Sequence, residues 1–404
     1  MRLAPARPSQ ILYLSLATGP SAGAPPGARY NRPMERALLR GATAARFLAR
    51  YWQQRPLLIR RAVDGFQGLL SWREATDLAT RDDVESRLVV RERGGWTLVH
   101  GPFRRSDFRA LPERNWTLLI QGVNLHVPAA DALLRRFSFV PYARLDDLMV
   151  SYAAPGGGVG PHFDSYDVFL LQGEGQRRWR LSRQRDLALK PDVPLKILAR
   201  FRPDHEVLLD PGDMLYLPPG IAHDGVAIAA CSTYSIGFRA PSAQELGIAF
   251  VDWLRDRIAL DGRYRDPGPP AARAPARIAR GLSDYAASAL SGLAWDDRTV
   301  ACFLGAYLTE PKPAVTFTPP GPPLARRLFT ARAARRGVRL DSRTQLLYDA
   351  RNLFINGDVL DRPTIGWPAI RRLANRRQLA ADDVDAGVAN LLYPWYRDGF
   401  VHLD

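Results

Sequence analysis

The tripeptide His162-Phe163-Asp164 and the later His223 are the residue types that hold a non-haem iron ion. Two imidazoles and one carboxylate form a facial triad, which leaves coordination positions open for a co-substrate and dioxygen. On a β-strand, residues two apart point to the same face, so His162 and Asp164 can converge on one ion. A histidine beside a carboxylate is also common in structural hydrogen-bond networks. This spacing alone therefore does not decide between a metal site and such a network.

Glycine- and proline-rich segments precede both candidate ligand groups. Residues 155–161, which include four glycines, predict an irregular loop before His162. The triplets Pro211-Gly212-Asp213 and Pro218-Pro219-Gly220 predict two tight turns before His223. With the second histidine placed in this way, an iron site is favoured over a structural network.

The segments around these turns have the character of short β-strands. Residues 146–153 alternate and are rich in strand formers. Residues 167–172 and 176–181 predict a hairpin around Gly173-Glu174-Gly175. Residues 208–217 predict a second pair of short strands, followed by a strand that begins near His223. Paired short strands that carry ligands are typical of a double-stranded β-helix, the cupin-type jelly-roll.

Several longer stretches resemble a known family when they are taken in order. They are residues 51–57, 100–103, 146–149, 155–162, 166–169 and 237–241. From about Met34 to Pro241 the chain resembles the bacterial JmjC-type ribosomal oxygenases, the YcfD-like enzymes. The resemblance implies a hydroxylase that depends on Fe(II), 2-oxoglutarate and O2, and the best-known member acts on an arginine of large-subunit ribosomal protein sixteen.

The resemblance also implies roles for individual residues. His162, Asp164 and His223 would bind the metal, and Arg177 would bind the far carboxylate of 2-oxoglutarate, which a guanidinium can grip with two hydrogen bonds. Ser151 would add a hydroxyl to the co-substrate. The family usually has a second serine where this chain has Ala153, so one detail of co-substrate binding differs.

Four residues match positions that line the target-arginine pocket of the family: Asp147, Met149, Tyr166 and Ser235. Without the resemblance, Asp147 would be interpreted as a carboxylate that caps a strand end or turn. A guanidinium needs a carboxylate and apolar or aromatic walls, so the four residue types suit an arginine side chain.

Other functions remain open at the level of sequence. The closest alternative is hydroxylation of a histidine on a ribosomal protein, and a demethylase is a further one. A non-catalytic, metal-binding cupin regulator is another, although a buried Arg177 would be costly without an anionic ligand. A DNA-binding role has the least support.

Composition sets the remaining bounds. The chain has 404 residues with 46% hydrophobic and 24% charged residues, which suits a soluble protein of two or three domains. The net charge of +15 comes from arginine, since lysine occurs only at positions 190, 196 and 312, and RNA contact is a minor hypothesis. The two cysteines, Cys231 and Cys302, suit a reducing cytoplasm, and no apolar stretch is long enough to span a membrane.

The chain is expected to be an α+β protein with four parts. Residues 1–33 are interpreted as a disordered tail or a mis-assigned start, and residues 34–241 as the JmjC/cupin catalytic domain. Residues 242–300 are expected to be helical, beginning with a capping box at Ser242 and Glu245, and to form a homodimer as in the family. Residues 314–404 are expected to form a winged-helix-like domain with helices at 344–353 and 367–375 and a terminal strand at 400–403.

Overall fold

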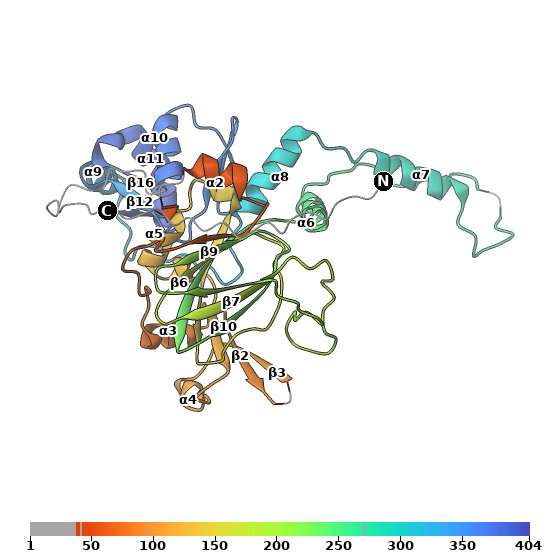
Figure 1. Ribbon diagram of the computed structural model, residues 1–404. Helices are drawn as coiled ribbons and strands as arrows, with labels where there is room; N and C mark the ends of the chain where they lie inside the picture. The colour runs from red at the N-terminus through yellow and green to blue at the C-terminus, as the bar shows by residue number, and fades with distance from the viewer. Residues whose placement is uncertain (1–37, 41–42, 94, 270) are drawn as a thin grey trace, which may run out of the picture. The chain divides into compact units, whose positions relative to one another are not determined.

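The computed structural model describes residues 38–40, 43–93, 95–269 and 271–404 (Figure 1). The prediction for residues 1–33 lies outside these residues. The chain divides into two compact units. The first extends to Ala240 and also includes Lys312–Phe317; the second consists of Pro241–Pro311 and Thr318–Asp404.

The first unit contains two antiparallel sheets with helices packed on the outer face of the larger one. Its helices are α2 (Ala44–Arg50), α3 (Trp72–Ala79), α4 (Arg105–Arg109) and α5 (Pro128–Arg135), with 3-10 turns at Val123–Leu125 and Tyr142–Arg144. Its strands are β1 (Leu57–Ile59), β2 (Ser86–Glu92), β3 (Gly95–His100), β4 (Trp116–Ile120), β5 (Leu145–Ala153), β6 (Val168–Gln172), β7 (Arg177–Ser182), β8 (His205–Leu209), β9 (Met214–Leu217), β10 (Ala222–Ala227) and β11 (Cys231–Phe238).

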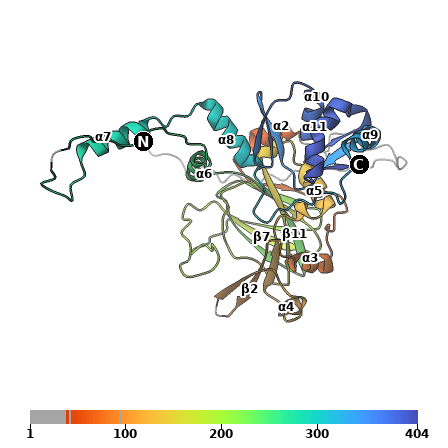
Figure 2. The ribbon, with the colours of Figure 1, turned by 180° about the vertical axis from the view of Figure 1, so that it is seen from behind.

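The strands form a jelly-roll. The larger sheet has the order β1-β9-β6-β11-β5-β4-β2-β3, and the smaller one has the order β10-β7-β8. Leu170 and Leu215 of the larger sheet share one buried cluster with Trp179 and Leu209 of the smaller sheet, so the two sheets face each other. The views from opposite sides show β7 and β10 in front of the larger sheet and β11 behind them (Figures 1 and 2). The predicted double-stranded β-helix is confirmed.

Alternation along β5 separates the core from the site. Leu148, Val150 and Tyr152 belong to the main hydrophobic core, where helices α2, α3 and α5 also pack. The intervening residues point to the opposite face because side chains alternate along a strand. Asp147, Met149, Ser151 and Ala153 therefore form a row on the face that looks toward the smaller sheet.

The predicted hairpin of residues 167–172 and 176–181 is wrong. β6 pairs with β9 and β11, whereas β7 pairs with β8 and β10, so the Gly173-Glu174-Gly175 turn carries the chain from one sheet to the other. The turn after β8 does the same, since β9 pairs with β1 and β6. A short glycine-rich connection looks alike in a hairpin and in a crossover. Only the partners of each strand distinguish them.

The second unit begins with three helices: α6 (Ala243–Arg255), α7 (Arg280–Ser291) and α8 (Asp297–Thr309). The capping box predicted for α6 is present. The backbone N–H of Glu245 donates to Ser242 Oγ at 3.1 Å, and the backbone N–H of Ser242 donates to a Glu245 carboxylate oxygen at 2.6 Å. None of the helices in the described part of the chain has the length and apolar character that a membrane crossing requires.

The rest of the second unit is a small mixed domain around a core that includes Phe329, Ile370, Leu373, Val388 and Leu392. Its helices are α9 (Arg326–Arg336), α10 (Trp367–Arg376) and α11 (Ala386–Arg397), with a 3-10 turn at Ala381–Asp383. Its strands are β12 (Val338–Leu340), β13 (Leu346–Tyr348), β14 (Asn352–Ile355), β15 (Asp358–Asp361), β16 (Gln378–Leu379) and β17 (Val401–Leu403). The helix predicted at 367–375 and the terminal strand are confirmed.

The helix predicted at 344–353 is wrong, because this segment forms β13, a turn and the start of β14. The turn is made by Asp349, whose carboxylate accepts hydrogen bonds from the backbone N–H groups of Arg351 at 2.7 Å and Asn352 at 2.6 Å. An aspartate that bonds to the backbone two and three residues later competes with helix formation.

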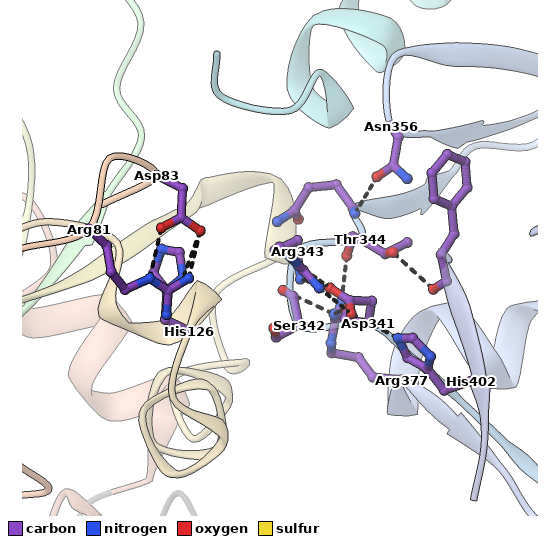
Figure 3. Close-up of polar contacts among 12 residues, drawn as sticks. Arg81, Asp83, His126, Asp341, Ser342, Arg343, Thr344, Asn356, Arg377 and His402 are labelled. Carbon is purple, nitrogen blue, oxygen red and sulfur yellow. Dashed lines mark hydrogen bonds and ion pairs between the residues drawn. The ribbon is translucent and has the colours of Figure 1, made fainter. Parts of the chain in front are cut away.

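Asp341 ties the last strand of this domain to its neighbours (Figure 3). The Asp341 carboxylate accepts hydrogen bonds from Arg343 Nε at 2.7 Å and from His402 Nε2 at 2.8 Å. Burial alone would raise the pKa of Asp341, but the hydrogen bonds from His402 and Arg343 outweigh it and hold the pKa well below its ordinary value. The same figure shows Arg81, Asp83 and His126 grouped in the first unit.

Candidate metal and co-substrate site

The three residues predicted to bind metal lie together. One ligand atom from each of His162, Asp164 and His223 lies within 4.8 Å of the other two. His223 Nε2 is 3.7 Å from Asp164 Oδ2, and the two imidazole centroids are 4.2 Å apart. Two nitrogens and one carboxylate oxygen at such spacing can converge on one divalent ion.

Backbone pairing holds the two histidines side by side. The N–H of His162 donates to the carbonyl of His223 at 2.9 Å, and the N–H of His223 donates to that of His162 at 2.7 Å. The N–H of Gly220 donates to the carbonyl of Asp164 at 2.8 Å. His162 forms this isolated bridge outside any named strand, so the local geometry differs from the regular strand expected from the sequence.

Each imidazole is oriented by a carbonyl two residues earlier. Nδ1 of His162 lies 2.9 Å from the carbonyl oxygen of Gly160, and Nδ1 of His223 lies 2.9 Å from that of Ile221. In a neutral imidazole these contacts place the proton on Nδ1 and leave Nε2 with a free lone pair. Gly160 has a φ of 81°, which favours glycine at this turn.

Electrostatics favours the neutral form that a metal requires. Burial, followed by the positive charge of a protonated His162, lowers the pKa of His223 to about 4. At neutral pH the His223 imidazole is therefore uncharged and available as a ligand. The donor set, with an uncharged His223, thus fits a non-haem iron ion.

Arg177 lies on the same inner face as His223. In the β10–β7 ladder, Arg177 is opposite Ala227 and Leu181 is opposite His223. The Arg177 side chain is buried, its residue being only 5% exposed, and its Nη2 lies 3.7 Å from Cys231 Sγ. Among the described residues it forms no ion pair with a carboxylate, and its Nε has no hydrogen-bond partner. A buried cation without an anion suits the far carboxylate of 2-oxoglutarate.

Small residues surround this arginine. Ala153, Ala227 and Cys231 form a separate buried cluster, and Ala153 is directly opposite Cys231 in the β5–β11 ladder. Ser151 is buried two residues before Ala153, and its hydroxyl has no hydrogen-bond partner in the described chain. Ser151 and Arg177 are polar groups beside this cluster that can hold a carboxylate, and the buried hydroxyl of Thr117, opposite Ala153, also has no hydrogen-bond partner in the described chain.

Asp147 is the buried acid at the other end of the β5 row. Its Oδ2 accepts hydrogen bonds from Gln121 Nε2 at 2.6 Å and from the N–H of Gly122 at 2.9 Å. Burial raises the pKa of Asp147 although Lys312 and these hydrogen bonds oppose the rise. The carboxylate thus anchors the Gly122 turn, as the capping interpretation expected. Its Oδ1 accepts no hydrogen bond within the described residues and stays available to a ligand.

The remaining predicted pocket residues border this acid. Met149 is opposite Ser235 in the β5–β11 ladder. Tyr166 is 40% exposed, and its pKa is raised by partial burial and then by the negative charges of Asp164, Asp147 and Asp146. Tyr166 is therefore close enough to the metal-site carboxylate and to the acids of β5 to feel their charge.

The sequence did not point to three other residues at the site. Cys231 beside Arg177, Gln121 beside Asp147, and Lys312 beside Asp146 and Asp147 are distant in sequence from the residues they contact. No local pattern marks them, since their proximity is created by strand pairing and by a late segment that returns to the first unit.

Two family sequence models match the chain. The JmjC domain matches residues 132–246, and the ROXA-like winged helix matches residues 292–402. The second match confirms the winged-helix-like fold expected for the C-terminal part.

Known proteins match over most of the length. The ribosomal protein uL16 3-hydroxylase of Escherichia coli (strain K12) is 36% identical over 345 residues, which cover 83% of this chain and 90% of that protein. The X-ray structure of E. coli ycfD superposes with a TM-score of 0.77 at 33% identity, covering 90% of this chain and 98% of that one. A structure of YcfD in complex with cobalt and 2-oxoglutarate has a TM-score of 0.75 at 32% identity, with the same coverage of both chains.

The similarity extends through both units, and the relative's structure holds cobalt together with 2-oxoglutarate. Those are the two groups that the donor set of His162, Asp164 and His223 and the buried Arg177 fit here. The chain belongs to the family of JmjC-domain ribosomal oxygenases.

Proposed function

We propose that this protein is an Fe(II)- and 2-oxoglutarate-dependent dioxygenase that hydroxylates an arginine side chain of ribosomal protein uL16. The observation that carries the proposal is the pairing of the His-Asp-His cluster with a buried arginine that has no carboxylate partner in the described chain. A metal-binding regulator would need the first feature but has no use for the second. The name of the E. coli relative supports the substrate.

Different residues on the inner face of the barrel bind the metal, the co-substrate and the substrate. His162, Asp164 and His223 hold the iron, while Arg177 and Ser151 hold the far carboxylate of 2-oxoglutarate. Once bound, iron and 2-oxoglutarate supply the oxidising power by consuming dioxygen. In the substrate pocket, Asp147 accepts hydrogen bonds from the substrate guanidinium and Ser235 adds a hydroxyl. Met149 and Tyr166 form the walls of this pocket. The protein thereby holds one C–H bond near the metal.

The acid favours an arginine over a histidine substrate. Asp147 Oδ1 lies beside Gly237, 3.6 Å from the position that a Cβ would take there, so no side chain stands on that side of the oxygen. A guanidinium is always charged and offers several N–H donors, whereas an imidazole is largely neutral at pH 7. The energetic cost of burying the Asp147 carboxylate is therefore offset better by a substrate arginine than by a substrate histidine.

Mass spectrometry of a uL16 peptide tests the proposal. The peptide is incubated with the protein, Fe(II), 2-oxoglutarate and air, with His162→Ala as the inactive control. We expect one added oxygen on an arginine, formed together with succinate, and neither in the control. Oxygen on a histidine would replace the arginine assignment. Bound iron and 2-oxoglutarate with no modified peptide would rule out this substrate.

We also propose that the protein is a homodimer joined through residues 242–300. Apolar side chains on α6 and α7 are exposed in the single chain, among them Ile248 at 55%, Val251 at 65% and Leu290 at 64%. Contiguous exposed apolar residues at a helix surface mark an interaction site. A second copy of the chain would cover them.

RNA contact is a further proposal, supported by α9. This helix carries Arg326, Arg327, Arg332, Arg335 and Arg336 and no acidic residue, and all five are exposed. Arginines bind phosphates and release counterions, so RNA binding should weaken steeply with salt. We also propose a cytoplasmic location, because a ribosomal substrate would be found there. An unchanged RNA affinity after Arg327 and Arg335 are replaced by glutamine would remove α9 from this proposal.

A further inference from the structure

A lysine from late in the chain lies on the acidic end of the β5 row. Lys312 Nζ is 3.2 Å from Asp146 Oδ1 and 3.7 Å from Asp147 Oδ2. Beyond Ala240, only the segment Lys312–Phe317 is grouped with the first unit. In sequence it joins α8 to the winged-helix-like domain, so a residue from far outside the JmjC match reaches the substrate side of the barrel.

The two side chains of this ion pair differ in how deeply they are buried. The side chain of Asp147 is 5% exposed and that of Lys312 is 41% exposed. Burial would lower the pKa of Lys312, but Asp147 and Asp146 outweigh it and raise the pKa, so the ammonium stays charged. Arg239 Nε lies 3.5 Å from Asp146 Oδ1, so Asp146 has a second cation nearby. Asp147 is fixed by Gln121 and Gly122, and Lys312 is the partner that can move away.

We propose that Lys312 is a built-in competitor of the substrate: the guanidinium can approach the free Oδ1 of Asp147, but to bind the carboxylate with both arms of its fork it must displace the ammonium that lies beside Oδ2. The proposal rests on the proposed function, in which Asp147 faces the target side chain. Pro311 and Pro313 flank Lys312 and limit backbone freedom, so the displacement is a movement of the lysine side chain.

The competition makes the site selective. A guanidinium offers a planar fork of N–H donors to a carboxylate, whereas an ammonium is a single point charge. A lysine from the substrate would gain nothing over Lys312, and a neutral histidine could not replace its charge. Specificity is a difference of affinities: an internal cation raises the binding threshold for every side chain, and a guanidinium is the side chain best able to overcome it.

The composition of the chain makes the displacement measurable. Lysine occurs only at positions 190, 196 and 312, so amine labelling read by mass spectrometry reports each side chain separately. The protein is loaded with Mn(II) and 2-oxoglutarate without oxygen and labelled with and without a uL16 arginine peptide. We expect the peptide to speed labelling of Lys312 several-fold and to leave Lys190 and Lys196 unchanged. The same peptide with the target arginine replaced by citrulline should have no effect.

Peptide binding to variants completes the test. Lys312→Gln should bind the peptide about five-fold more tightly, since about 1 kcal/mol of ion pairing no longer has to be broken. KM should fall with kcat unchanged, and Lys196→Gln should match the original protein. The 2-oxoglutarate affinity should not move in either variant, because Arg177 and Ser151 lie at the other end of the β5 row.

Two outcomes would overturn the inference and can be told apart. If the original protein hydroxylates the peptide but Lys312 labelling slows or stays constant, and Lys312→Gln binds no more tightly, then Lys312 is a fixed structural ion pair and the proposed function stands. If neither the original protein nor Lys312→Gln binds the peptide, the substrate assignment and the competition are both wrong.

Discussion

The Arg177 guanidinium lies in the interior without a carboxylate partner among the described residues, and an uncompensated buried charge lowers the stability of a fold. We expect Arg177→Met to raise the Tm of the protein by about 2–5 °C when 2-oxoglutarate is absent, from about 1–2 kcal/mol of relieved desolvation. With Co(II) present in every sample, excess 2-oxoglutarate should raise the Tm of the original protein, as any ligand of the native state does, but not that of the variant.

Differential scanning calorimetry with and without 2-oxoglutarate measures both Tm values for each protein and so checks both expectations. Arg178→Met is the matched control, because Arg178 alternates to the other face of β7 and should keep the ligand response. A variant that is less stable without ligand, or that still responds to 2-oxoglutarate, would contradict the assigned role of Arg177.

Asp147 carries a similar conflict between charge and burial. Because burial raises its pKa above the ordinary value, its contribution to folding is most favourable below the pKa of the unfolded chain and declines as pH rises through the folded pKa. We therefore expect Asp147→Asn not to lower the Tm at pH 7.5, while the KM for the arginine peptide rises at least about ten-fold through the lost ion pair. A lower Tm with an unchanged KM would instead assign Asp147 a purely structural role at the Gly122 turn.

At the scale of elements, Asp341 joins β12 to β17 in the second unit. Its pKa is held below the ordinary value, so its stabilising effect is complete above the unfolded pKa of about 4 and is lost as pH falls through the folded pKa. We expect Asp341→Asn to cost about 2–3 kcal/mol at pH 7 because charge-assisted hydrogen bonds are lost. Hydrogen exchange measures the protection of the amides of β12 and β17. At pH 7 these amides should be less protected in the variant than in the original protein, and this difference in protection should shrink toward pH 3.

Much of the element pattern could be predicted from local sequence. The capping box at Ser242, the helix from Trp367 and the strand at Val401 depend on residues only a few positions apart. The candidate iron triad was equally visible, since two of its members lie two residues apart and the third follows characteristic turns. The spatial convergence of His162, Asp164 and His223 agrees with that expectation.

Two of the failures concern information that no local window contains, whereas the one at Asp349 comes from a local hydrogen bond. The turn at Gly173-Glu174-Gly175 is a crossover because β7 finds its partners in β8 and β10, which come later in the chain. The segment 344–353 has a helical pattern of apolar residues, but Asp349 bonds to the backbone of Asn352 and turns it into two strands. Lys312 reaches Asp147 only because a late segment returns to the first unit.

At the scale of the whole molecule, the exposed apolar side chains of α6 to α8 predict an assembly. We expect Val251→Asp to convert a dimer into a monomer, because a charge buried in an apolar interface is not compensated. Sedimentation velocity measures the mass of both proteins. Val99→Asp, at a residue of β3 that is 44% exposed, should leave the mass unchanged. A monomeric original protein would exclude this use of the helices.

The reciprocal backbone bonds between His162 and His223 have a consequence for the life of the enzyme in a cell. The two imidazoles are held in register by the chain itself, so the cage for the ion persists when the ion leaves. A chelator should therefore strip the protein without unfolding it, and activity should return when Fe(II) is supplied again. Because the ligands stay arranged without an ion, Zn(II) or Co(II) can also bind when iron is scarce. The fraction of active enzyme would then follow the iron supply of the cell.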